Sequence, residues 1–213
     1  MKRIINLTSL SLILLLAATC GLIYFTNHFI LTVNFYAKSG ELVSAFPSQE
    51  WKFYQTLQKW IYLSSILYLL IKLCLITLIL YTALFLRGCE LSFEKLFRVT
   101  ILSEYIFMIP AVIKIIGFRN AYPDGNLMDW HKYFVLSSLS LFPAAPADWY
   151  YTLQTFNVFE IVYWFLLAFG ISRAGQLTFD HSLKIVVSSY LPALIVWVTL
   201  ITFCSLVMFP LTA

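Results

Sequence analysis

Long apolar stretches separated by short polar segments dominate the chain. Five of them are long enough, or nearly so, to cross a membrane, and they cover residues 5–30, 61–86, 99–118, 153–171 and 185–208. A spanning helix needs about 20 predominantly apolar residues. Each stretch is expected to be helical, because lipid offers no partners to free backbone N–H and C=O groups. The pattern predicts an all-α fold, a polytopic membrane bundle of five transmembrane helices.

A sixth apolar stretch, YFVLSSLSLFP at 133–143, is too short to cross a bilayer. It runs into PAAPADW, where two prolines and an aspartate disfavour continuation of a helix. We therefore expect a short re-entrant or interfacial helix near 133–142, in the segment that precedes the fourth span.

The composition agrees with a lipid environment. Of the 213 residues, 61% are hydrophobic and 11% are charged, and the mean hydropathy is +0.85. A soluble domain carries about 25% charged residues, so this chain has too few charges to cover a soluble surface. The length suits one integral membrane domain over residues 1–213 rather than two domains.

The distribution of basic residues predicts the orientation. Cytoplasmic loops carry an excess of Lys and Arg, and an inner N-terminus gives seven basic residues inside against five outside, on shorter inner loops. The N-terminus is therefore expected inside. The net charge of +4 then reflects membrane orientation and not nucleic-acid binding, because no basic stripe interleaves with aromatic residues. The inner set is Lys2, Arg3, Arg87, Lys95, Arg98, Arg173 and Lys184, and the outer set is Lys38, Lys52, Lys59, Arg119 and Lys132.

The first apolar stretch has an alternative interpretation as a lipoprotein signal that is cleaved before Cys20. Lys2 and Arg3 precede an apolar core, as in such signals. Signal cores are usually about 7–15 residues long, whereas this one is longer and continues past the cysteine as GLIYF. These features favour an uncleaved first span, with lipidation of Cys20 as the alternative.

The sequence contains no familiar catalytic or metal-binding motif. It lacks HExxH, GxSxG, P-loop and CxxC patterns. The three histidines fall in three different segments, and His131 has Asp129 nearby but no third ligand at metal spacing. We therefore expect no enzymatic activity, no cofactor and no metal.

Four ionisable residues fall inside the predicted spans: Lys72, Glu104, Lys114 and Glu160. Such residues are costly in hydrocarbon, usually face the bundle interior, and often pair or mark function. With a rise of about 1.5 Å per residue, Glu160 lies at a depth compatible with Lys72 or Lys114. Glu104 is expected to pair with Arg98 or to extend toward the inner surface.

Helical spacing places Asn157 and Glu160 on one face of the fourth span, and Tyr68 and Lys72 on one face of the second. Two polar faces of opposite charge favour contact between the spans. A structural ion pair is one explanation, and a proton- or substrate-handling site is another. General acid–base catalysis is a third.

Residues 84–113, LFLRGCELSFEKLFRVTILSEYIFMIPAVI, resemble the middle of the Yip-like family of five-span membrane proteins. In that family a short inner loop with a glycine precedes a Ser-Phe pair, and the following span contains a proline. Gly88, Ser92, Phe93 and Pro110 occupy those places here.

Residues 156–186 are similar to the fourth span of the same family. An Asn-x-Phe stretch is followed by an aromatic residue, a closing glycine and a short inner loop with a basic residue. The matching positions are Asn157, Phe159, Trp164, Gly170 and Lys184.

The resemblance implies a non-enzymatic protein that organises or accompanies other membrane components, with the lipid bilayer and other membrane proteins or itself as partners. Because the chain starts almost at its first span, it implies a bacterial cytoplasmic membrane rather than a eukaryotic endomembrane. Ser92, Phe93 and Phe97 are candidates for a docking turn on the inner side, or for a capped interfacial turn. The alternative function is a small transporter or permease-like subunit that uses Glu160 and Lys72.

Overall fold

The computed structural model describes residues 2–32, 35, 47–142 and 144–208. Five helices within these residues are long and apolar enough to cross a membrane. The predicted all-α bundle of an integral membrane protein is therefore confirmed. Lys38, which entered the charge comparison, lies outside the described residues. The five helices cover Leu7–Phe29, Gln58–Leu86, Phe93–Ala121, Val158–Gly175 and Phe179–Met208.

Four of the spans belong to single helices, and one is composite. The single helices are α1 (Lys2–Phe29), α3 (Pro47–Leu86), α8 (Val158–Gly175) and α9 (Phe179–Met208). The third span joins α4 (Phe93–Glu104), the 3-10 turn η1 (Tyr105–Phe107) and α5 (Met108–Ala121).

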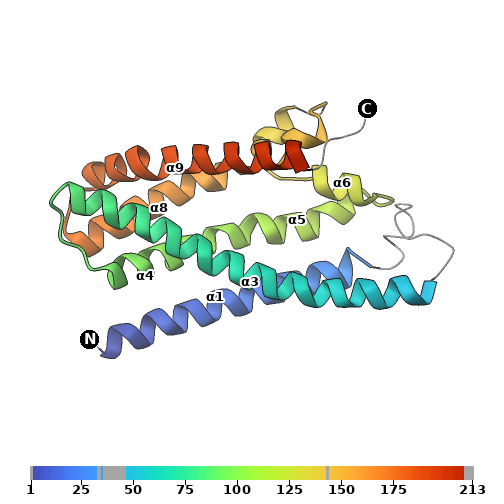
Figure 1. The fold of residues 1–213 in the computed structure, drawn as a ribbon, viewed down its shortest axis with the longest axis horizontal. Helices are drawn as coiled ribbons and strands as arrows, with labels where there is room; N and C mark the ends of the chain where they lie inside the picture. Colours follow the sequence, from blue (N-terminus) through green and yellow to red (C-terminus); the bar gives the residue numbers. More distant parts are fainter. Residues whose placement is uncertain (1, 33–34, 36–46, 143, 209–213) are drawn as a thin grey trace.

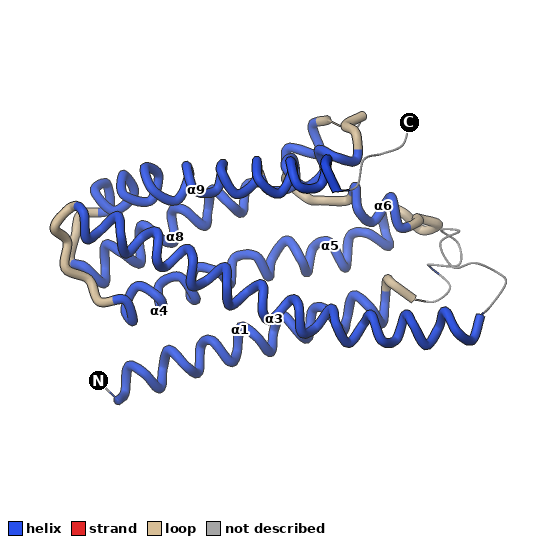
Figure 2. Tube along the Cα trace, in the orientation of Figure 1, coloured by secondary structure: helices blue, strands red, loops and turns tan. Residues whose placement is uncertain are grey.

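The spanning helices lie side by side along the long axis of the molecule (Figures 1 and 2). The start of α1, the α3–α4 connection and the α8–α9 connection share one end. The connection between α5 and α8 and the end of α9 share the other. With five spans, the two ends of the described chain therefore lie on opposite sides of the bundle.

Pro110 accounts for the change of helix type inside the third span. A proline lacks the N–H that would bond the carbonyl four residues earlier, here that of Ile106. The chain tightens into the 3-10 turn η1 directly before this point. The third span thus crosses the bundle as two α-helical halves joined by η1.

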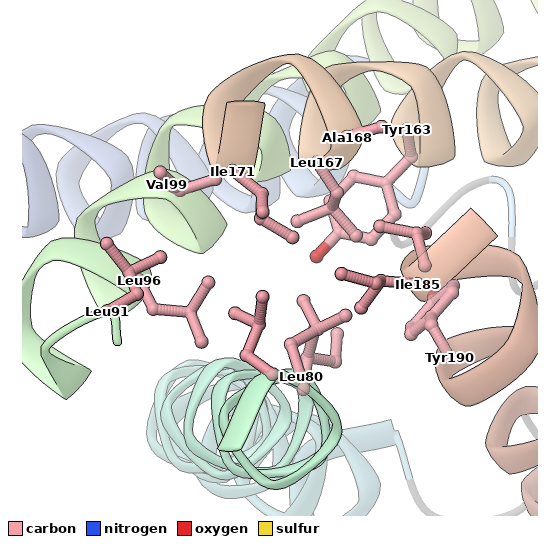
Figure 3. Packing of buried hydrophobic residues seen from close by; sticks show 13 residues of the cluster. Leu80, Leu91, Leu96, Val99, Tyr163, Leu167, Ala168, Ile171, Ile185 and Tyr190 are labelled. Carbon is pink, nitrogen blue, oxygen red and sulfur yellow. The ribbon is translucent and has the colours of Figure 1, made fainter. Parts of the chain in front are cut away.

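The main core lies between α3, α4, α8 and α9 (Figure 3). Leu80, Leu96, Leu167 and Ile185, one from each helix, are fully buried there. α1 packs at the side, where Leu15 joins a second cluster with α3 and α4 residues. The four-helix core is the frame that positions the polar residues.

Gly170 allows α8 to approach α4 closely. A Cβ atom at this position would overlap the side chain of Val99. Small residues at helix contacts in membranes let backbones come together, and van der Waals packing then holds the pair. The glycine at the end of the fourth span therefore has a packing role in this bundle.

The segment between α5 and α8 contains four short elements. They are α6 (Leu127–Lys132), the 3-10 turns η2 (Ser138–Leu141) and η3 (Ala147–Trp149), and α7 (Tyr150–Thr155). Asn126 and Asp129 form a capping box that starts α6. The helix expected near 133–142 is limited to η2, because the chain passes Leu136 with a φ of 56° before it turns.

Candidate functional site

The start of α8 is fixed by Asn157, which lies just outside the helix. Its side-chain oxygen accepts a hydrogen bond from the backbone N–H of Glu160 at 2.9 Å. Its amide donates to the carbonyl of Gln154 at 2.8 Å. The predicted fourth span, 153–171, therefore starts too early, since α7 ends at Thr155 and the cap begins a new helix at Val158.

The preceding connection holds this cap in place. Ser137 and Asn157 form an isolated antiparallel bridge. The backbone N–H of Ser138 donates to Phe156 at 2.9 Å, and that of Val158 donates to Leu136 at 3.0 Å. The cap and the bridge together orient the first turn of α8, which carries Glu160.

Glu160 is bonded by uncharged donors. Its Oε1 accepts from the Oη of Tyr190 at 2.7 Å and from the Nε1 of Trp164 at 3.0 Å. Its residue is only 6% exposed. Both of its side-chain hydrogen bonds to described residues go to this one oxygen, and Oε2 has none among them.

The intramembrane ion pair joins a different glutamate. Lys72 Nζ lies 2.5 Å from Glu104 Oε1, and it also lies 4.2 Å from the centre of the Phe107 ring. The expectation that Glu104 meets Arg98 was therefore wrong, as was the expectation that Glu160 meets a lysine. The position of a residue along a helix determines its depth in the membrane but not the direction in which its side chain points. Glu104 points from α4 toward α3, where it meets Lys72.

Two buried polar atoms near this pair lack hydrogen-bond partners among the described residues. They are Oε2 of Glu104 and the hydroxyl of Tyr163. Such atoms are uncommon, because leaving a buried polar group unpaired costs about 1–3 kcal/mol. Glu104 and Tyr163 interact with each other electrostatically, so the two atoms belong to one local polar cluster.

Lys114 belongs to a separate environment. Its Nζ lies 4.4 Å from the centre of the Trp130 ring and 5.3 Å from that of Phe134. Aromatic faces attract cations through the ring quadrupole, so the connection between α5 and α8 holds this lysine. The predicted contact between Lys114 and Glu160 is not formed.

A cavity of about 420 Å³ opens beside Glu160, between α3, α7, α8 and α9. Lys72, Asn157, Glu160 and Tyr190 contribute its polar lining near the start of α8. Sites for small ligands usually have volumes of about 300–1,000 Å³ and mostly apolar walls with a few polar groups. The lining also contains apolar residues of α3 and α9, which are Ile71, Leu75, Ile76, Ile79, Ala193 and Leu194.

The cavity reaches the surface of the bundle. Three of its lining residues on α3 are also exposed there, namely Tyr68 at 52%, Ile71 at 48% and Leu75 at 43%. These exposed positions lie within a predicted membrane span, so the opening faces the apolar part of the surroundings.

No protein-family model matches this chain, and no curated protein and no solved structure matches it. The resemblance to Yip-like proteins therefore stays a prediction.

Three cavity residues that carry both an aromatic ring and a polar atom were not among the sequence candidates: Tyr151, Tyr190 and Trp197. The Nε1 of Trp197 donates to the hydroxyl of Tyr151 at 2.9 Å. Burial raises the pKa of the Tyr151 phenol above its usual value, so this group is neutral at physiological pH. The polar atoms of these three side chains, in otherwise apolar segments, could have marked them as candidates. Spacing along one helix, however, does not predict which residue of another helix a ring contacts.

The candidate docking turn lies at the opposite end of the bundle. Ser92 occupies the N-cap position of α4, but its side chain makes no capping hydrogen bond, so that part of the prediction was wrong. Phe93 is 41% exposed and stacks on Phe97 with ring centres 6.1 Å apart. Tyr81 meets Phe93 edge-on at 5.9 Å, which makes a small aromatic surface at the α3–α4 turn.

Within the described residues, no group of three or more His, Cys, Asp or Glu side chains is placed to hold a metal ion. The intramembrane polar residues thus divide into an ion pair, a lysine held by aromatic rings, and a carboxylate on a cavity. Of these groups, the carboxylate of Glu160 is the one that can still accept a hydrogen bond or an ion pair from a ligand.

Proposed function

We propose that this integral membrane protein binds a small amphipathic molecule in the cavity beside Glu160 and acts as a small carrier or a permease-like subunit. The observation that carries the proposal is that Glu160 lines a cavity of about 420 Å³ with one carboxylate oxygen unbonded. The lining combines polar groups, among them Lys72, Asn157 and Glu160, with apolar side chains of α3 and α9. A molecule with a polar head and an apolar body fits that combination.

A purely structural role explains Glu160 less well. A carboxylate in a membrane is costly, and the usual structural solution is a direct pair with a basic residue. Lys72 makes such a pair with Glu104 instead. Glu160 is held by two neutral donors and faces an opening, which is the arrangement expected of a group that meets a ligand.

Labelling with the membrane-soluble reagent dicyclohexylcarbodiimide tests access to Glu160 in the full chain. The reagent adds to carboxyl groups in apolar surroundings, and peptide mass spectrometry locates the adduct. We expect modification at Glu160 and little at Glu104, whose Oε1 is paired with Lys72.

Two matched substitutions complete the test. Ala193→Phe places a ring in the cavity and should block labelling, whereas Ala17→Phe adds the same ring to the exposed face of α1 and should not. An unmodified Glu160 in folded wild-type protein, or equal modification of Glu104, would contradict the proposal.

A second role, in organising other membrane proteins, is favoured by the aromatic surface of Tyr81, Phe93 and Phe97. Chemical cross-linking in native membranes tests it. Phe93→Ser should remove cross-linked species that the control Phe165→Ser, on the exposed face of α8, retains. Identical cross-linking patterns in both variants would contradict this role.

A further inference from the structure

We propose that the ligand of the cavity is an organic cation, with an ammonium-type head that pairs with Glu160 and an apolar body that lies between α3 and α9. The proposal rests on the proposed function and names the ligand class for the same site. Three features carry it: the charge around the cavity, the rings that line it, and the free oxygen of Glu160.

The charged groups of the site do not balance. One lysine, Lys72, stands with two glutamates, Glu104 and Glu160. Lys72 contacts Glu104 directly at 2.5 Å, so its charge is matched within that pair. With all three groups ionised, the site carries a net charge of −1, and that charge lies on Glu160. A bound cation completes the balance.

The other groups that face Glu160 supply hydrogen bonds and not charge. Tyr190 and Trp164 donate hydrogen bonds to its Oε1. The phenols of Tyr68 and Tyr151 on the cavity wall, and that of Tyr163 beside Glu104, are neutral groups. Lys114 does not line the cavity. Lys72 also lines the cavity, but its direct ion pair is with Glu104, so the place of a cation in direct contact with Glu160 is left to a ligand.

The walls of the cavity suit a cationic head. Four aromatic rings of the cavity have no lysine or arginine of the described residues lying over them. They are Tyr68, Tyr151, Tyr190 and Trp197. Aromatic rings around a carboxylate form the usual setting for quaternary ammonium groups. The same protein holds its own cations in this way, since Lys72 lies over Phe107 and Lys114 over Trp130.

An apolar body on the ligand follows from the remaining lining. Ile71, Leu75, Ile79 and Leu194 contribute apolar lining from α3 and α9. A small hydrated inorganic ion would leave these side chains unused and would have few oxygen ligands, whereas Ca²⁺ or Mg²⁺ takes six or more. The cavity therefore matches an amphipathic organic cation.

Binding of three probes of similar shape to the purified full chain in lipid nanodiscs tests the charge preference. Benzyltrimethylammonium is the cation, neopentylbenzene is its uncharged carbon isostere, and phenylmethanesulfonate is the anion. Binding to empty nanodiscs is subtracted for each probe. We expect saturable binding of the cation, with at least about tenfold weaker binding of the other two probes.

Variants locate the binding site. Glu160→Gln keeps an acceptor for Tyr190 and Trp164 but removes the charge, and we expect at least about tenfold weaker cation binding. Glu90→Gln removes an exposed carboxylate from the α3–α4 turn and should leave binding unchanged. Tyr68→Leu should weaken binding about two- to fivefold, and Tyr68→Phe, which keeps the ring, should not.

The outcomes separate this inference from the proposed function. Preferred binding of the anion, or cation binding that Glu160→Gln leaves unchanged, would overturn the cation assignment while carbodiimide labelling of Glu160 could still hold. Absence of saturable cation binding to folded wild-type protein would overturn it as well. Should Glu160→Gln fail to fold, Ala193→Phe provides the second variant, and it must abolish cation binding.

Discussion

Glu104 and Glu160 show how two glutamates in one bundle acquire different roles. Glu104 faces Lys72 across the contact between α3 and α4, and the two charges neutralise each other. Glu160 is held by a tyrosine and a tryptophan through one oxygen, and the residue lines the cavity. The first is expected to matter most for stability and the second for binding.

Stability measurements on single variants should separate these roles. Glu104→Gln leaves Lys72 with a largely unmatched charge, and breaking a buried pair from one side costs about 3–5 kcal/mol. Because the Lys72 side chain is 24% exposed, we expect a loss near the lower limit, about 3 kcal/mol. Glu160→Gln should cost about 1 kcal/mol, since the amide oxygen still accepts hydrogen bonds.

Denaturant-induced unfolding in detergent micelles measures both losses. The double variant Lys72→Met with Glu104→Met should recover most of the stability, because no charge is then left without a partner. Equal losses for Glu104→Gln and Glu160→Gln would contradict the assignment of separate roles.

At the residue scale, the sequence identified which side chains were unusual but not how they combine. The low-dielectric surroundings made Lys72, Glu104, Lys114 and Glu160 stand out. Their partners depend on the rotation of each helix about its axis and on the packing of neighbours. Tyr190, on another span, could therefore not be assigned to Glu160 from spacing.

At the scale of elements, hydropathy predicted the spans well and their ends less well. Length and composition are sufficient to locate a spanning helix. The boundary between α7 and α8 depends instead on Asn157, whose side chain accepts a hydrogen bond from the backbone N–H of Glu160 and so caps α8. The same limit applies to the third span, where Pro110 lacks a backbone N–H and the 3-10 turn η1 precedes it.

Gly170 offers a test of helix packing. Gly170→Ala introduces a methyl group against Val99, and overpacking of this kind typically costs about 1–3 kcal/mol. Gly21→Ala is the matched control in α1, because nothing lies within 4 Å of the added carbon. It should be neutral or stabilising by up to about 1 kcal/mol, as alanine favours helix more than glycine does.

Thermal unfolding of the two glycine variants in the same detergent decides the comparison. A Gly170→Ala protein as stable as Gly21→Ala would show that α8 and α4 do not approach as closely as the structure places them.

At the scale of the whole molecule, the fold arranges its connections on two sides. The α3–α4 and α8–α9 connections share one end with the start of α1, and the α5–α8 connection lies at the other (Figure 1). The distribution of Lys and Arg predicts that the first end is cytoplasmic. The opening beside Glu160 then lies in the outer half of the membrane.

Labelling with a membrane-impermeant maleimide tests this orientation in intact cells. Cys89, in the α3–α4 connection, should react only after the membrane is permeabilised. A cysteine introduced as Asp148→Cys in η3, in a Cys89→Ser background, should react without permeabilisation. The reverse pattern would invert the orientation while leaving the fold unchanged.

The central claim is that Glu160 stands on an accessible cavity as the counter-ion of an organic cation. The most direct measurement is carbodiimide modification of Glu160 in the wild-type protein, followed by peptide mass spectrometry, with and without benzyltrimethylammonium. We predict that the cation protects Glu160 in a saturable manner and that neopentylbenzene and phenylmethanesulfonate do not. Equal modification of Glu160 with and without the cation would contradict the account.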